Sequence, residues 1–210
     1  QVKLLSLCDF HIIATAYLQL TSLTMYQHLR VNLGRIKLRT ADVVIAFQTI
    51  NHHTHRLSHL TFIQFSGNAL LDMEIAELMA SVEEPGLYVL DYVPNASAAS
   101  IDEVGEQFFR VIRDAHPDVP VIFVEDPVFP HSAYDNAIRK EIAEKNASQK
   151  RLFARLRKAG EKRIYYVGAE GMIGDDGEAT VDGIHFTDLG AMRYVEHLLP
   201  VVKKALRKSE

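Results

Sequence analysis

From residue 60 onward, the chain alternates short apolar runs with longer amphipathic stretches, and this alternation restricts its fold more than any other feature. Runs of branched and aromatic residues predict buried strands at 60–65, 86–93, 119–126 and 163–169. Helical spacing of apolar residues, or long polar-faced stretches, predict helices at 72–82, 100–116 and 135–159, and from 188 onward. This order of elements predicts a three-layer α/β/α sandwich with a parallel, flavodoxin-like sheet.

Local signals mark the ends of several of these helices. Ser100 and Glu103 form a capping box at the start of the second helix. Gly160 follows the third helix as a C-cap, and Thr187 is a good N-cap for the last one.

In residues 1–59, neither the helical nor the strand spacing of apolar residues continues for long, although residues 41–47 predict one strand. We interpret 1–59 as a divergent segment and 60–210 as a single domain.

The net charge of −4 offers no basic surface for nucleic acid. No apolar run reaches the roughly 18 residues of a membrane helix, and Asp9 and His11 interrupt the opening residues, which make a poor signal peptide.

The loops that follow the predicted strands should meet at one edge of the sheet, where α/β proteins bind their ligands. In the first loop, Gly67 has no Cβ, so its N–H can closely approach a substrate. In the second, Pro94 keeps the preceding residue extended, so Asn95 presents its amide at the strand end. These two groups predict a pair of donors for a developing oxyanion. The loop at 125–134 could shape a substrate pocket.

The loop before the last helix reads "TVDGIHFTDLG" and contains Asp182 three residues before His185. One interpretation is a simple turn followed by a helix start. The other is a hydrolytic relay, in which Asp182 accepts a hydrogen bond from one ring nitrogen and leaves the other free as a general base.

The ordered set "FSGN", "YVLDYVPN", "PVIFVED" and "GDDGEATVDGIHFTDLG" resembles the SGNH (GDSL-like) hydrolase superfamily, in particular its bacterial branch with a Ser-Gly-Asn second block. The resemblance covers about 145 residues from Phe65. It implies a serine esterase that hydrolyses small-molecule esters without a metal or other cofactor. It also implies that Asp182 and His185 are the catalytic acid and base, and that Gly67 and Asn95 contribute to the oxyanion hole.

The nucleophile that the resemblance implies is not identifiable in this sequence. The family places its serine in a glycine-flanked turn after the first strand, whereas Ser6, Ser22 and Ser58 have no such turn. Ser66 belongs to the second block, and Gln64 replaces the glycine that usually precedes it. A non-catalytic domain that binds a ligand with the same fold is therefore an alternative to an esterase.

A metal site is a further alternative, because "NHHTHRLSH" contains His52, His53, His55 and His59. His55 and His59 have the spacing of two ligands on one helical turn. No acidic residue or cysteine lies beside them in the sequence, which favours a solvated segment instead.

Overall fold

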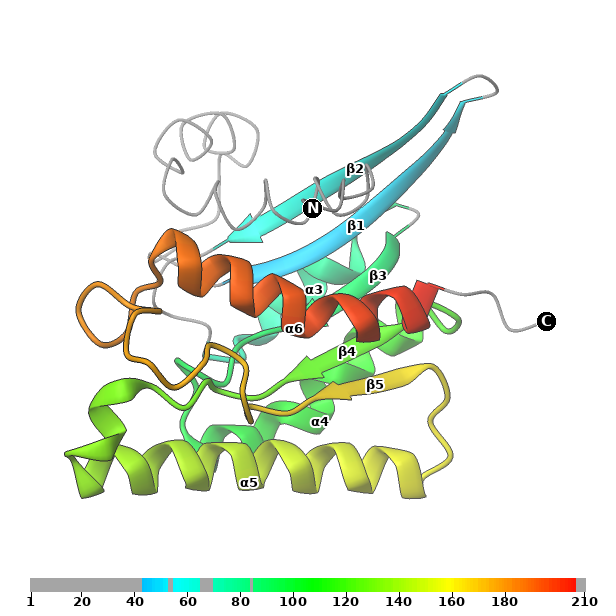
Figure 1. Ribbon diagram of the computed structural model, residues 1–210. Helices are drawn as coiled ribbons and strands as arrows, with labels where there is room; N and C mark the ends of the chain where they lie inside the picture. Colours follow the sequence, from blue (N-terminus) through cyan, green and yellow to red (C-terminus); the bar gives the residue numbers. More distant parts are fainter. Residues whose placement is uncertain (1–42, 53–54, 65–69, 84, 207–210) are drawn as a thin grey trace.

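The computed structural model describes residues 43–52, 55–64, 70–83 and 85–206, and for 43–64 it describes the backbone alone. A five-stranded sheet in the order β2-β1-β3-β4-β5 forms the centre of the fold. Its strands are β1 (Val43–His52), β2 (His55–Gln64), β3 (Pro85–Leu90), β4 (Val121–Val124) and β5 (Ile164–Val167). Figure 1 shows this sheet with helices packed around it.

The predicted parallel sheet is present in β3, β4 and β5, because β4 pairs in parallel with both β3 and β5. The strands expected at 41–47 and 60–65 belong to a hairpin, in which β1 is antiparallel to both β2 and β3. Only two residues separate β1 from β2, and so short a connection can join antiparallel strands but not parallel ones. The hairpin therefore extends the parallel sheet at one edge.

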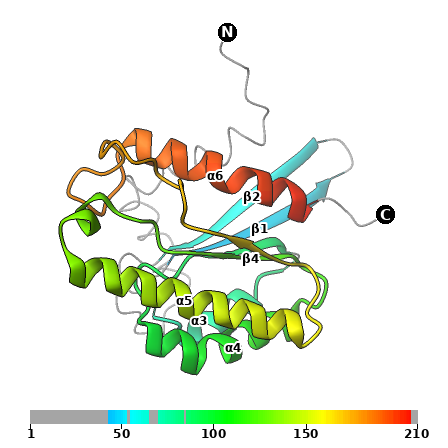
Figure 2. The same ribbon diagram turned by 60° about the horizontal axis from the view of Figure 1, so that its bottom comes forward.

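The helices are α3 (Met73–Ala80), α4 (Ala98–Ala115), α5 (Asn136–Lys158) and α6 (Asp188–Leu206). Figure 2 shows α6 on one side of the sheet and α3, α4 and α5 on the other, so the fold has the predicted three layers. Alternate residues of β3 and β4 supply the two hydrophobic cores. Tyr88 and Phe123 pack toward α3, α4 and α5, whereas Val89 and Ile122 pack toward α6.

Two of the predicted helix ends agree with the structure, and one does not. Ser97, not Ser100, is the N-cap of α4, because the Ser97 side chain accepts the Ser100 N–H at 3.0 Å. The residue three after Ser97 is Ser100 and not a glutamate or glutamine, so the capping-box signal points to Ser100, which already lies within the helix. Gly160 does follow α5, with φ of +91°. Its N–H donates to Arg157 O at 3.1 Å, as in a Schellman ending.

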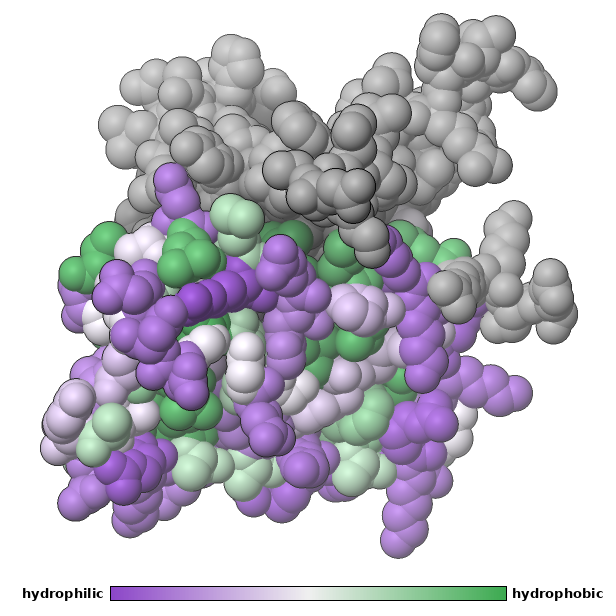
Figure 3. Space-filling model, in the orientation of Figure 1, coloured by the Kyte–Doolittle hydropathy of each residue, from purple (hydrophilic) through white to green (hydrophobic). Residues whose placement is uncertain are grey.

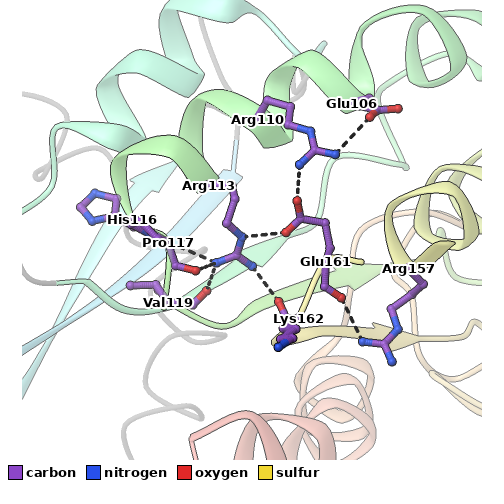
Figure 4. A network of polar contacts seen from close by, with 9 residues as sticks. All are labelled: Glu106, Arg110, Arg113, His116, Pro117, Val119, Arg157, Glu161 and Lys162. Carbon is purple, nitrogen blue, oxygen red and sulfur yellow. Dashed lines mark hydrogen bonds and ion pairs between the residues drawn. The ribbon is translucent and has the colours of Figure 1, made fainter. Parts of the chain in front are cut away.

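The edge of the sheet at which β4 and β5 begin is held by a buried arginine, Arg113 of α4 (Figure 4). Its Nη1 donates to three carbonyl oxygens in the segment between α4 and β4, at 3.2, 2.9 and 2.7 Å. Its Nη2 donates to Lys162 O just before β5 at 3.3 Å, and its Nε pairs with Glu161 Oε2 at 3.3 Å. One side chain thus links α4 to the beginnings of two strands.

The described residues of the histidine-rich segment lie in strands, and His53 lies outside the described residues. His52 ends β1 and pairs with His55 at the start of β2, and His59 lies further along β2. Residues four apart in a strand are roughly 13 Å apart, too far to share one ion as neighbours on a helical turn would. The helical spacing assumed for a metal site at His55 and His59 is therefore wrong. Across the residues with a described structure, no helix has both the length and the apolar character that crossing a membrane requires.

Candidate active site

The carboxyl ends of four strands lie at the same edge of the sheet. Val43 pairs with Gln64 at the end of β2, and Val44 pairs with Leu90 at the end of β3. In the parallel part, Leu90 pairs with Phe123, and Val124 pairs with Val167. The loops at 91–97, 125–135 and 168–187 therefore begin at one edge, which we call the carboxyl edge. Gly67 and the rest of 65–69 lie outside the described residues.

Asp182 and His185 lie in a tight turn that opens α6. Asp182 Oδ1 accepts the backbone N–H groups of Ile184 and His185 at 3.0 and 2.8 Å. Gly183 between them has φ of +96°, a backbone conformation that glycine adopts without strain. The Val181 N–H donates to His185 O at 2.8 Å and closes the turn. The sequence "DGIH" therefore folds on itself and brings both side chains to one side.

The expected hydrogen bond between the two side chains is present. His185 Nδ1 lies 2.6 Å from Asp182 Oδ2. Because an ionised carboxylate only accepts, Nδ1 carries the proton and Nε2 is left with a free lone pair. The side chains are 77% and 52% exposed, so this Nε2 can be reached from solvent. The arrangement can act as an oriented general base.

Hydrogen bonds also determine the charge of Asp182. The His185 side chain, followed by the backbone N–H groups of His185 and Ile184, holds the pKa of the Asp182 carboxyl well below its usual range. The carboxylate therefore stays ionised at any pH where a histidine base could work.

Thr187 joins this turn to α6. Its Oγ1 accepts the Gly190 N–H at 3.1 Å and donates to Glu178 O at 2.8 Å, which confirms the predicted N-cap. The first turn of α6 packs closely at Gly190, because a Cβ there would lie 1.9 Å from Ala179 O. The helix thus begins directly behind His185.

Asn95 lies in the loop that follows β3, at the carboxyl edge. Its N–H donates to Tyr92 O at 3.0 Å in a turn, and its side chain is half-buried. Two residues of α5 hold this turn from behind. Lys145 Nζ donates to Pro94 O at 3.2 Å, and the Tyr92 hydroxyl donates to Gln149 Oε1 at 2.6 Å.

The loop at 125–134 contacts the "DGIH" turn directly. It contains a short 3-10 helix, η1 (Pro130–Ala133), from which His131 Nδ1 reaches Gly183 O at 2.8 Å. The buried Phe129 ring stacks on His131 and also lies 6.5 Å from Phe186. The sequence predicts a role for this loop, but it gives no signal for the contact with residue 183.

Two buried carboxyl groups at the carboxyl edge were missed in the sequence, although both directly follow predicted strands. Asp91 accepts a hydrogen bond from the Tyr194 hydroxyl of α6, and burial raises its pKa to about 6. Burial, together with the negative charge of Asp91, raises the pKa of Asp126 to about 7, against the attraction of Lys145. The Oδ1 atoms of Asp91 and Asp126 have no hydrogen-bond partner among the described residues.

The surface around His185 is both apolar and acidic. Val128, Tyr134, Val181 and Ile184 expose large apolar side chains, and Figure 3 shows apolar surface at the end of the molecule where α6 begins. The segment 170–188 contains several acidic residues and neither lysine nor arginine. They are Glu170, Asp175, Asp176, Glu178, Asp182 and Asp188. Within the described ranges, no three His, Cys, Asp or Glu side chains are grouped to hold a metal ion.

Comparison of the chain with known proteins identifies a family whose sequence and structure are similar to it. A sequence model of the GDSL-like lipase/acylhydrolase family matches residues 51–203. A crystal structure from Bacteroides ovatus, described as that of a GDSL-like lipase, is 30% identical with a TM-score of 0.65. The match covers 68% of this chain and 42% of that one. No curated protein sequence matches the chain significantly.

Two further structures are similar in fold alone. A salicylyl-acyltransferase from a tetracycline biosynthetic pathway is 17% identical with a TM-score of 0.54, over 65% of this chain and 43% of that one. A carbohydrate esterase family 3 structure from Talaromyces cellulolyticus is 16% identical with a TM-score of 0.50, over 70% and 72%. The chain thus spans less than half the length of the first two structures.

Proposed function

Because the chain belongs to the GDSL-like lipase/acylhydrolase family, within the SGNH hydrolase superfamily, we propose that it is a serine-type esterase acting on short acyl esters. The observation that carries this proposal is the hydrogen bond between Asp182 and His185 in an exposed turn at the carboxyl edge. A binding protein has no need of an oriented general base, whereas an esterase does.

In the proposed reaction, His185 Nε2 takes the proton of a nucleophilic hydroxyl as its oxygen attacks the ester carbonyl carbon. The carbonyl oxygen becomes an oxyanion, for which we assign Gly67 and Asn95 as donors. When the carbon–oxygen bond breaks, His185 returns the proton to the leaving alcohol and an acyl-enzyme remains. Water then attacks the acyl group in the same way and regenerates the hydroxyl. Asp182 holds the imidazole ring throughout.

The nucleophile is unassigned in this proposal. Among the residues that the structure describes, Asp182 is the hydrogen-bond partner of the His185 ring. Because no hydroxyl group of these residues forms a hydrogen bond with the His185 ring, a second candidate function is a non-catalytic domain that binds an ester or a related ligand. The two candidates differ in turnover alone.

The surroundings of His185 favour an uncharged substrate. Arg193 pairs with Asp176 at 2.6 Å, but the other acidic residues of segment 170–188 still disfavour anions. The apolar side chains exposed in this segment and in the loop at 125–134 favour contact with an acyl group. Acylated carbohydrates are neutral and carry short acyl groups, so we propose them as the first natural esters to test.

The deciding experiment compares p-nitrophenyl acetate hydrolysis by the wild type and by His185→Ala. An esterase requires turnover in the wild type that falls to background in the variant. Equal, negligible rates would instead leave the ligand-binding function as the better account. A fluorophosphonate probe that labels the wild type would identify the nucleophile by mass spectrometry.

A further inference from the structure

His131 connects two loops that lie far apart in the sequence. Its Nδ1 is 2.8 Å from Gly183 O, in the turn between Asp182 and His185. A carbonyl oxygen can only accept, so Nδ1 carries the proton and donates. The bond therefore attaches the "DGIH" turn to η1.

The position of His131 is itself well determined. Its ring stacks on the buried Phe129, with ring centroids 5.9 Å apart and planes inclined by 20°. Its carbonyl oxygen accepts the N–H groups of Tyr134 and Asp135, both at 3.0 Å. Arg139 of α5 adds two hydrogen bonds to η1, to Ser132 O at 2.9 Å and Ala133 O at 2.8 Å. His131 thus projects from a segment held by the core and by a helix.

The "DGIH" turn approaches His131 closely. A Cβ on Gly183 would lie 3.1 Å from His131 Nδ1, closer than ordinary contact. The side chains of Asp182 and His185 are largely exposed, so packing does little to hold them. Most of the hydrogen bonds of the turn are internal, joining Asp182 to Ile184 and His185. Internal bonds keep its shape, so its place on the sheet depends on the contacts that leave the turn. These include the packing of Phe186 on Phe129, the Thr187 bond to Glu178 O and the bond to His131.

We propose that His131 is a positioning residue, which holds Gly183 O and so places the Asp182–His185 pair over the carboxyl edge. This proposal rests on the proposed esterase function, and it adds a residue that touches neither substrate nor nucleophile. A loss of the anchor would leave the pair intact but variable in position. Because a displacement of about 1 Å can cost a hundredfold in rate, catalysis should suffer more than substrate binding.

Two variants distinguish the contribution of the His131 hydrogen bond from that of its aromatic ring. His131→Phe keeps an aromatic ring that can stack on Phe129 but removes the donor. His131→Asn gives up the ring but keeps an N–H group at a position close to that of Nδ1. The matched control is His116→Phe, because His116 also contacts an aromatic ring, Tyr88, and a backbone carbonyl, Ala80 O at 2.9 Å. His116 ends α4, away from the carboxyl edge.

The first test is steady-state hydrolysis of p-nitrophenyl acetate. For His131→Phe we expect kcat to fall roughly tenfold, with KM changed less than about twofold, because one hydrogen bond is lost. For His131→Asn we expect kcat to stay within about threefold of the wild type. His116→Phe should match the wild type. Equal kcat values for His131→Phe and the wild type would overturn the proposal, and so would an equal loss in His131→Asn.

The second test does not depend on turnover. Amide hydrogen exchange at Ile184 and His185, whose N–H groups donate to Asp182, reports how firmly the turn is held. We expect about tenfold faster exchange at both in His131→Phe, and unchanged exchange in His131→Asn and His116→Phe. Unchanged exchange in His131→Phe would refute the anchoring. If exchange behaves as expected but no protein hydrolyses esters, the anchor stands and the esterase function fails.

Discussion

The Asp182 carboxylate holds His185 at two points. Its Oδ2 lies 2.6 Å from the ring Nδ1, and its Oδ1 accepts the His185 backbone N–H at 2.8 Å. The same carboxylate therefore sets the tautomer of the ring and the shape of the turn that carries it.

Replacing Asp182 by asparagine should abolish most of the proposed activity. The amide can present its N–H to the ring and stabilise the wrong tautomer, which costs about 10⁴-fold in kcat in a serine–histidine–aspartate triad. We expect a loss of roughly 10³–10⁴-fold in p-nitrophenyl acetate hydrolysis. Asp175→Asn, a change of the same kind at an exposed position in the same loop, is the control. A loss below tenfold would mean that Asp182 does not orient the base.

Asn95→Ala should remove one proposed oxyanion donor. The loss of one such donor costs about 10²–10³-fold in kcat, and KM should change little because the donor acts on the transition state. The control is Asn136→Ala, at the exposed start of α5. If Asn95→Ala mainly raised KM, the side chain would bind the ground state and the assignment would be wrong.

Asp126→Asn should change how stability depends on pH. The pKa of Asp126 is raised to about 7 in the folded protein, above the about 3.9 of an unfolded chain. The folded state therefore binds this proton more tightly, and stability falls as the pH rises from about 4 to above 7. The asparagine variant cannot ionise at this position, so its stability relative to the wild type should rise between pH 5 and pH 8.

The rise between pH 5 and pH 8 should be on the order of 2 kcal/mol, measured by urea unfolding at both pH values. Asp91, with its pKa raised to about 6, remains in the variant and keeps part of the pH dependence. Asp175→Asn, at an exposed carboxyl, should leave the difference between pH 5 and pH 8 as it is in the wild type. A variant that loses stability in parallel with the wild type between these pH values would contradict this account.

Gly190→Ala should destabilise the fold, although alanine is more favourable than glycine in a helix by about 1 kcal/mol. A Cβ at residue 190 would lie 1.9 Å from the backbone oxygen of Ala179, which cannot move without displacing the loop. We expect a loss of about 3 kcal/mol in the free energy of unfolding. The comparison is Gly105→Ala in α4, where the one short contact of the new Cβ, 2.7 Å, would be with the tip of the Leu152 side chain and not with backbone. Equal unfolding midpoints for the two variants would refute the role of this contact.

Local patterns in the sequence predict much of the fold and part of the site. Apolar runs locate β3, β4 and β5, and the spacing of Asp182 and His185 predicts their hydrogen bond because both lie in one turn. The sequence does not predict the hairpin, since His53-Thr54 between its strands is not a glycine-containing turn signal. The roles of Gly67, Asn95, Asp182 and His185 in catalysis stay predictions.

Contacts between distant segments are the part that the sequence does not predict. His131 meets Gly183 across 52 residues, and Tyr194 meets Asp91 across 103 residues. Such pairs follow from the packing of loops and helices around the sheet, and they have no period along the chain. An acidic residue directly after a buried strand is the one signal that could have indicated Asp91 and Asp126.

The arginine at the opposite edge of the sheet has a consequence for how the domain opens. Arg113 joins four backbone carbonyls and Glu161 at the beginnings of β4 and β5, whereas the carboxyl edge is joined through loops. Local unfolding should therefore begin among the loops of the carboxyl edge, which can lose one contact at a time, and should reach the beginnings of β4 and β5 last.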